Sequence, residues 1–447
     1  MATDSSPAIE IRETIDGVPA GDAAAGTPRR KGLFGLMSKK DADPDKASNP
    51  KSDTYIWGTY IVLVIVALIE GYSASSSLVK TSADVYKPLI ENAVFLFIGF
   101  CFTFMLQKVH YKWIKMYAGF IFIVSIFLLV WATVAGDNLN GASRAISKYG
   151  ISIQPPEIIK LTMVIYLAKI LAKYQKPGGV RTTGVIWCAL TTGIVAVLLY
   201  INGLTNAAMV FCTSLAMWLI GGIEWRKIGI VLLIAVGVGG VAYTVKATTR
   251  AETHESRIAE YTRGIKPTDT ITDKNRQPMF ARFAIARGGI VNTAPGSSHE
   301  SARLPLAYSD FIYSIIVEDG GIVGGVLLIA LYIGLLMRAG AIARKCRRAF
   351  PALLIMGCAV MIVLQALVHM VIVVGIVPVS GQPLPLISKG GTSIIVMSMA
   401  FGIMLSVSRY AVRSNNKKEI RAELKQLDED ISAINPAIAD SADVPTK

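Results

Sequence analysis

The sequence has little charge and none of the short motifs by which many soluble enzymes are recognised. Only 17% of its 447 residues are charged, whereas 53% are hydrophobic and the mean hydropathy is +0.50. No Walker loop, GxSxG or HExxH pattern occurs, and the four histidines (His110, His254, His299 and His369) stand apart from one another. These absences exclude an ordinary soluble protein of this length and argue against an ATP-driven enzyme.

The sequence also lacks paired cysteines and a concentrated basic surface. The five cysteines lie in or beside apolar segments without a CxxC pair, so neither a disulfide scaffold nor a metal site is indicated: Cys101, Cys188, Cys212, Cys346 and Cys358. The net charge of +14 comes from Lys and Arg scattered in short loops rather than gathered on one face. This charge therefore indicates membrane topology and not a nucleic-acid partner.

Long apolar runs are what the sequence has in abundance. Each is long enough for a membrane-spanning helix of about 20 residues. They begin near Tyr55, Pro88, Ile114, Pro156, Gly184, Leu204, Ile228, Phe311, Pro351 and Thr392. The sequence therefore predicts an all-α polytopic membrane protein with ten transmembrane helices in residues 55–412.

Polar segments divide the rest of the chain. Residues 1–54 are rich in Ala, Gly, Pro, Asp and Lys and include no cleavable signal peptide, so we expect a disordered tail. Residues 413–447 form a second tail, with a charged segment from 419 to 430 that has helical spacing. A long polar stretch, 247–310, separates spans seven and eight and is predicted to be a large extracytoplasmic loop.

The distribution of positive charge predicts the orientation. One set of short loops carries twelve Lys and Arg: Lys108, Lys112, Lys173, Lys176, Arg181, Arg226, Lys227, Arg338, Arg344, Lys345, Arg347 and Arg348. The opposite set carries five: Lys80, Lys87, Arg144, Lys148 and Lys389. Because cytoplasmic loops are enriched in positive charge, the first set and both tails are predicted to lie in the cytoplasm, with the chain in the inner membrane.

The stretch Arg303–Phe311 ends this polar loop and leads directly into an apolar span. Asp310 should therefore lie where the loop meets the membrane surface, and a carboxylate is costly there without a use. Glu318 and Asp319 follow about two turns further along the helix, so the segment is interpreted as one wall of a site. The alternative is that Asp310 only caps the N-terminus of the helix.

Four motifs in order carry a family resemblance. They are Tyr72–Ser76 at the end of the first span, Asn140–Arg144 followed by Gln154–Leu161, Pro305–Phe311, and Pro378–Ser393 before the last span. In this order and at these spacings, residues 55–412 resemble the SEDS family of FtsW and RodA. The chain departs from the family pattern at Leu306 and Tyr308, which replace Glu and His, and at Asn202–Asn206, which lacks an acid.

The resemblance implies a peptidoglycan glycosyltransferase that polymerises lipid II, an undecaprenyl-diphosphate-linked disaccharide peptide, outside the membrane. It implies Asp310 as the catalytic general base and, as partners, a class B penicillin-binding protein of the FtsI type and other division proteins. The long N-terminal tail and Gln382 favour the FtsW type, hence septal synthesis in cell division. A RodA-like elongation polymerase and a lipid II flippase are the alternatives, and the use of a divalent cation is left open.

The leaving lipid diphosphate requires positive groups near the outer face, and guanidinium groups suit phosphate oxygens. The candidates are Arg144, Lys160, Arg282, Arg287 and Lys389. Two alternatives stay open: Lys160 pairs structurally with Glu157 three residues earlier, or the arginines contact lipid headgroups. Small residues of spans eight and nine, including Gly321, Gly325, Ala352 and Gly357, are predicted to allow close packing against a membrane partner.

Overall fold

The fold was analysed in a computed structural model of the whole chain. It describes residues 51–76, 87–135, 137–139, 142–148, 151–176, 178–233, 261–262, 264, 271–272, 275–292, 298–304 and 307–411. The predicted tails, apart from residues 51–54, and most of the predicted loop 247–310 lie outside the described residues. The predictions made for those segments therefore stay predictions.

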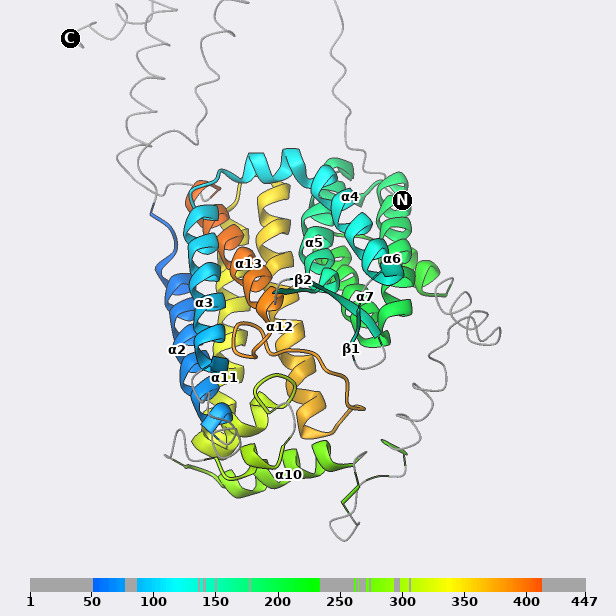
Figure 1. The fold of residues 1–447 in the computed structure, drawn as a ribbon. Helices are drawn as coiled ribbons and strands as arrows, with labels where there is room; N and C mark the ends of the chain where they lie inside the picture. The colour runs from blue at the N-terminus through cyan, green and yellow to red at the C-terminus, as the bar shows by residue number, and fades with distance from the viewer. Residues whose placement is uncertain are drawn as a thin grey trace, which may run out of the picture. The chain divides into compact units, whose positions relative to one another are not determined.

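Nine long helices dominate the described part of the chain (Figure 1). They are α2 (Thr54–Ser76), α3 (Lys87–Leu106), α4 (Tyr111–Ala135), α5 (Pro155–Tyr174), α6 (Thr182–Asn202), α7 (Leu204–Ile220), α11 (Ile312–Lys345), α12 (Ala349–Val374) and α13 (Gly391–Tyr410). Each begins within three residues of its predicted start. Residues 225–233 are also helical, near the predicted start of the seventh span.

Seven of these helices are long and apolar enough to cross a membrane. This confirms the prediction of a helical, multi-pass membrane protein. Of the other two, α7 has only 17 residues, and α5 carries four charged side chains, Glu157, Lys160, Lys169 and Lys173. The count of ten spans stays a prediction.

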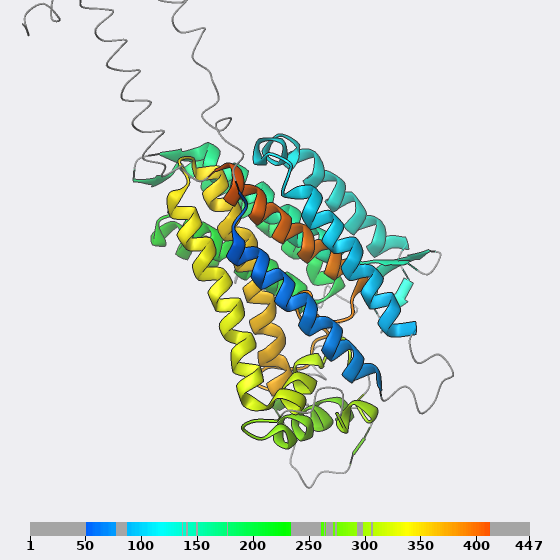
Figure 2. The ribbon, with the colours of Figure 1, turned by 90° about the vertical axis from the view of Figure 1, so that its left-hand side faces the viewer.

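The centre of the bundle is built from α5, α12 and α13. The apolar windows of α12 and α13 are 67% and 78% buried, compared with 22% for α3. Helix α5 packs against α4, α6, α7, α12 and α13, which explains how a helix with charged residues is accommodated. Figure 2 shows α2, α3 and α13 side by side, with α11 and α12 next to them.

Residues near the start and the end of the described bundle are in contact with each other. Asp53, just before α2, forms an ion pair with Arg338 near the end of α11, and its main-chain N–H donates to Ser408 Oγ of α13 at 3.1 Å. The Tyr410 hydroxyl donates to the main-chain oxygen of Lys108, at the turn between α3 and α4. Positions 53 and 408 therefore lie at the same end of the bundle, as an even number of spans requires.

Short strands join some of the helices and were not predicted from the sequence. Between α4 and α5, strands β1 (Asp137–Leu139), β2 (Ala142–Lys148) and β3 (Ile151–Ile153) form an antiparallel sheet in the order β1-β2-β3, with Ile146 opposite Ile153. Strands β4 (Gln175–Lys176) and β5 (Gly179–Val180) form a two-stranded hairpin before α6.

A short amphipathic helix, α10 (Arg276–Gly288), lies across the end of the bundle and packs on α11 and α12 (Figure 1). The close contact depends on Gly321, where α11 is kinked and φ is +70°. A Cβ atom at Gly321 would lie 2.5 Å from the main-chain oxygen of Ile290. Gly321 therefore serves packing within the chain.

Gly357 also packs internally, because a Cβ there would lie 2.7 Å from Cγ1 of Val164 on α5 and 2.9 Å from Cε of Met217 on α7. The prediction that Gly321 and Gly357 belong to a face for another protein is wrong. Small residues let helix backbones approach closely, and in this chain the approaching segments are its own.

Candidate active site

Asp310 lies in a turn formed by residues 307–310, directly before α11. The N-cap residue of α11 is Phe311, whose side chain forms no capping hydrogen bond. Asp310 precedes the N-cap position by one residue. Its side chain is half-buried.

The carboxylate of Asp310 lies against Gly381, which is 71 positions further along the chain. A Cβ atom at Gly381 would be 2.8 Å from Oδ2 of Asp310, so a larger residue at position 381 would displace this carboxylate. Two hydrogen bonds hold the same segments together: Ser388 Oγ donates to the oxygen of Ser309 at 2.6 Å, and the N–H of Lys389 donates to the oxygen of Tyr308 at 2.9 Å. The third and fourth sequence motifs thus meet at Asp310.

The segment 378–390 is anchored inside the bundle through its carbonyl oxygens. Tyr332 of α11 donates to Pro385 O at 2.7 Å, and Gln365 of α12 donates to Pro383 O at 3.1 Å. His369 Nδ1 lies 2.6 Å from the oxygen of Gln382. Irregular backbone at membrane depth needs such partners, because lipid supplies none.

Lys389 lies beside Asp310's turn but is already paired. Its ammonium is 2.9 Å from Glu91 Oε2 at the start of α3, and it lies 5.4 Å from the centre of the Tyr308 ring. The side chain is 25% exposed. Lys389 therefore joins α3, the turn of Asp310 and the segment before α13 at one point.

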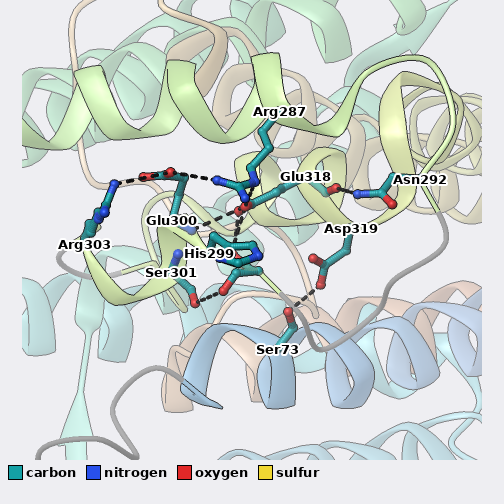
Figure 3. Close-up of polar contacts among 10 residues, drawn as sticks. Ser73, Arg287, Asn292, His299, Glu300, Ser301, Arg303, Glu318 and Asp319 are labelled. Carbon is teal, nitrogen blue, oxygen red and sulfur yellow. Dashed lines mark hydrogen bonds and ion pairs between the residues drawn. The ribbon is translucent and has the colours of Figure 1, made fainter.

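Glu318 forms hydrogen bonds with a different segment, residues 298–300, which precedes Asp310 in the chain (Figure 3). Its carboxylate, only 2% exposed, accepts hydrogen bonds from Ser298 Oγ at 2.6 Å and from the N–H groups of His299 and Glu300 at 2.9 and 3.3 Å. These bonds fix the start of the 3₁₀ helix η2 (Glu300–Ala302).

Two arginines surround this cluster. Arg287 of α10 is 3.7 Å from Glu300 Oε1 and 4.0 Å from Glu318 Oε1, and Arg303 is 3.8 Å from Glu300 Oε1. Figure 3 shows both guanidinium groups directed at the acids. Both arginines remain accessible, since the side chains of Arg287 and Arg303 are 50% and 66% exposed.

Asp319 points away from Glu318, towards α2, where Ser73 donates a hydrogen bond to Oδ2 (Figure 3). The prediction that Asp310, Glu318 and Asp319 line one wall is therefore wrong. They lie on one stretch of chain but contact the segment around Gly381, the turn at 298–300 and helix α2, respectively. Only Asp310 is half-buried, whereas the other two are buried.

We predict that Glu318→Gln lowers the free energy of unfolding by about 1.5–3 kcal/mol, because hydrogen bonds to a charged acceptor contribute that much. Chemical denaturation in detergent measures the loss, and hydrogen exchange should rise at residues 298–304. Glu91→Gln is the matched control. It breaks an ion pair at the protein surface and should change stability by less than about 1 kcal/mol. Unaltered exchange at 298–304 in Glu318→Gln would contradict this role.

Lys160 is buried within α5, with 3% exposure. Its ammonium lies 2.7 Å from Glu157 Oε1 and 2.8 Å from Gln365 Oε1, while Ser393 Oγ is 3.4 Å from the second oxygen of Glu157. The ion pair between Lys160 and Glu157, one of the alternatives that the sequence left open, is therefore present. Because Gln365 also holds Pro383 O, Lys160 connects through it to the segment that contains Gly381.

The remaining predicted cations are dispersed. The guanidinium of Arg282 lies against Gly375, where a Cβ would be 2.8 Å from Nη2, next to the C-terminal end of α12. A helix C-terminus attracts a cation. Arg144 lies in β2, and its side chain is outside the described residues. Within the described ranges, no three His, Cys, Asp or Glu side chains come together as a metal site.

Comparison with known proteins places this arrangement in a family. Residues 53–413 match the model of the FtsW, RodA and SpoVE family, described as cell cycle protein. The chain belongs to this family. The match covers every long helix of the bundle and both segments that meet at Asp310.

Members of the FtsW, RodA and SpoVE family with similar sequences are named for cell-wall synthesis and sporulation. The probable peptidoglycan glycosyltransferase FtsW of Coxiella burnetii is 28% identical over 362 residues, or 79% of this chain and 95% of the relative. Stage V sporulation protein E of Bacillus subtilis is 28% identical over 361 residues, or 78% and 95%.

Solved structures of the family support the fold. The rod shape determining protein RodA of Thermus thermophilus superposes with a TM-score of 0.59 at 24% identity, covering 81% of this chain and 98% of RodA. A chain of a peptidoglycan synthase complex that coordinates polymerization and crosslinking gives a TM-score of 0.63 at 24% identity, covering 80% and 98%.

Proposed function

We propose that this protein is a peptidoglycan glycosyltransferase that polymerises lipid II at the outer face of the cytoplasmic membrane, with Asp310 as the general base. The 4-hydroxyl of the acceptor sugar attacks the anomeric carbon of the growing chain. The proton of that hydroxyl passes to the Asp310 carboxylate as the new C–O bond forms, and the bond to the lipid diphosphate breaks. A positioned carboxylate is a suitable acceptor for this proton.

The observation that carries the proposal is the contact between Asp310 and Gly381. A half-buried carboxylate is held where two polar segments meet at the end of a membrane bundle, with the Gly381 backbone packed directly against it. A carboxylate in such a place is costly to keep without a function. Family membership and the names of the relatives supply the reaction class.

For the departing diphosphate, the proposal assigns Lys389 and Arg287, whose side chains are 25% and 50% exposed. Lys389 exchanges its bond with Glu91 for phosphate oxygens. Arg144 and Arg282 remain candidates for the same role. Lys160, which is buried and paired, is instead assigned to positioning the segment that contains Gly381.

The proposal also includes the membrane and the partners. Both tails lie in the cytoplasm, following the twelve-to-five distribution of Lys and Arg. Asp53 and Ser408, which are in contact, would then lie at the cytoplasmic end, and Asp310 at the outer end. The partners are a class B penicillin-binding protein and other proteins of septal synthesis, since the FtsW-type relatives favour division over elongation.

The test is polymer synthesis by the full chain purified with its partner. A single-span class B penicillin-binding protein from the same cell should co-purify in detergent, and the complex should convert lipid II into glycan strands that form a ladder on a gel. Absence of polymer from well-folded complex would remove the activity. Failure of every such protein to co-purify would remove the partner assignment.

One observation favours the alternative of a lipid II flippase. Gln365, which accepts a hydrogen bond from Lys160, lies nine residues before the end of α12, about 13.5 Å deep at 1.5 Å per residue. Polar groups thus extend about halfway through a bilayer core of about 30 Å, as they do in transporters. The polymer assay separates the two functions, because a flippase moves lipid II without joining its sugars.

A further inference from the structure

A cavity of about 340 Å³ opens next to the segment that contains Gly381. Its walls come from the first turns of α7, from α12 and from the segment before α13. Gly203, Asn206, Gly381 and Gln382 are among the lining residues. The volume lies at the lower end of the range of about 300–1,000 Å³ for small-molecule sites.

A buried amide with an unused hydrogen-bonding atom lies in this lining. Gln382 is 5% exposed, and its Nε2 donates to Asn206 Oδ1 at 3.2 Å. Among the described residues, nothing donates to Gln382 Oε1. Reversing the amide would leave Nε2 unused instead, so one polar atom is without a partner in either orientation. Such a group is costly in a protein interior unless a ligand completes it.

The composition of the cavity determines which chemistry fits. Among the described residues, no Asp, Glu, Lys or Arg lines it, so the lining does not suit a diphosphate, which requires Arg or Lys. Val368, Ile372 and Val379 form an apolar wall, and the N-cap of α7, Gly203, has no side-chain cap. A secondary amide with a methyl group matches these features: its N–H and carbonyl satisfy Gln382 and the helix N-terminus, and the methyl contacts the wall.

The cavity is directly connected to the proposed active site. Gly381 lines it and also contacts the carboxylate of Asp310. A sugar whose 2-substituent entered the cavity would have its ring beside that carboxylate. Resting on the proposed function, we infer that this cavity is a specificity subsite for an N-acetyl group of the lipid-linked sugar, with Gln382 as the residue that recognises the amide.

The test measures binding in the full chain bearing Asp310→Asn, so that bound substrate is not consumed. The probes are lipid II and a neutral analogue with hydroxyl groups in place of both N-acetyl groups. The Asp310→Asn protein in nanodiscs should bind lipid II about 10- to 10²-fold more tightly than it binds the analogue, because the analogue leaves the buried amide of Gln382 unpaired. Adding Gln382→Met should make the affinity for lipid II nearly equal to the affinity for the analogue.

A second variant tests the cavity without altering Gln382. Ala208 lines the cavity and is exposed, so Ala208→Phe can fill it with little change to the core, and should weaken lipid II binding about 10-fold. Leu219→Phe, at the other end of α7, is the matched control and should bind lipid II normally. Equal binding of the two probes to the Asp310→Asn protein, or a preference that survives in both variants, overturns the subsite.

The outcome is independent of the polymer assay. If the preference for lipid II is present but the unmodified complex makes no glycan, the subsite stands and the proposed polymerase activity fails. If glycan is made but neither variant changes the preference, the activity stands and the subsite fails.

Discussion

Asp310→Asn should fold and bind its partner but make glycan about 10²- to 10⁴-fold more slowly than the unmodified protein, because it loses a positioned base. Asparagine keeps the shape of the side chain beside Gly381 and can still accept hydrogen bonds. It cannot take the proton of the acceptor hydroxyl at neutral pH. Gel quantification of glycan formed from lipid II over time measures the effect.

Asp53→Asn is the matched control for this experiment. It makes the same chemical change at the opposite end of the bundle, where Asp53 pairs with Arg338, and the rate should stay within about twofold of normal. Near-normal polymer from Asp310→Asn, in a protein with unchanged thermal unfolding, would show that Asp310 is not the general base. The junction of the two segments would then be structural.

Lys160→Met should be the most destabilising single change proposed here, lowering the free energy of unfolding by about 3–5 kcal/mol. The substitution leaves Glu157 buried without its cation and removes the donor to Gln365. Replacing both charges, as Glu157→Leu with Lys160→Met, should recover most of the loss, since a well-packed apolar pair often substitutes for a buried ion pair. Chemical denaturation of the three proteins gives these values.

Polymerisation by the double variant then reports on positioning. Lys160 donates a hydrogen bond to Gln365, and Gln365 donates one to Pro383 O. Ser388, in the same segment as Pro383, donates one to Ser309 O in the turn of Asp310. We expect the stable double variant to remain about 10- to 10²-fold slow, because small displacements of a catalytic group have effects of that size. Full recovery of both stability and rate would make the pair structural only.

Two residues near Asp310, Leu306 and Tyr308, depart from the motif of the family. Leu306 lies outside the described residues, whereas Tyr308 has a definite place: its ring lies near the Lys389 ammonium and its carbonyl accepts the Lys389 N–H. Lys389 thus contacts the residue that replaces the family's His, a contact between two motifs that the sequence alone did not indicate.

The sequence by itself determined the membrane class, the starts of nine long helices to within three residues, and the stretch that contains Asp310. These features are local. An apolar run of about 20 residues specifies a spanning helix wherever it occurs, because lipid leaves backbone groups no other partner. Four motifs in fixed order were sufficient to indicate the family for the same reason: they can be recognised without knowing what they contact.

Only the tertiary structure decided which of these residues work together. It separated Asp310 from Glu318 and Asp319, although all three lie within ten positions, and brought Gly381 to Asp310 across 71 positions. It also gave Lys160 its buried partner on α12 and brought Gln382 to Asn206 across 176 positions. Helical periodicity specifies which face a side chain occupies, whereas its contacts depend on how distant helices pack, and one sequence does not encode that locally.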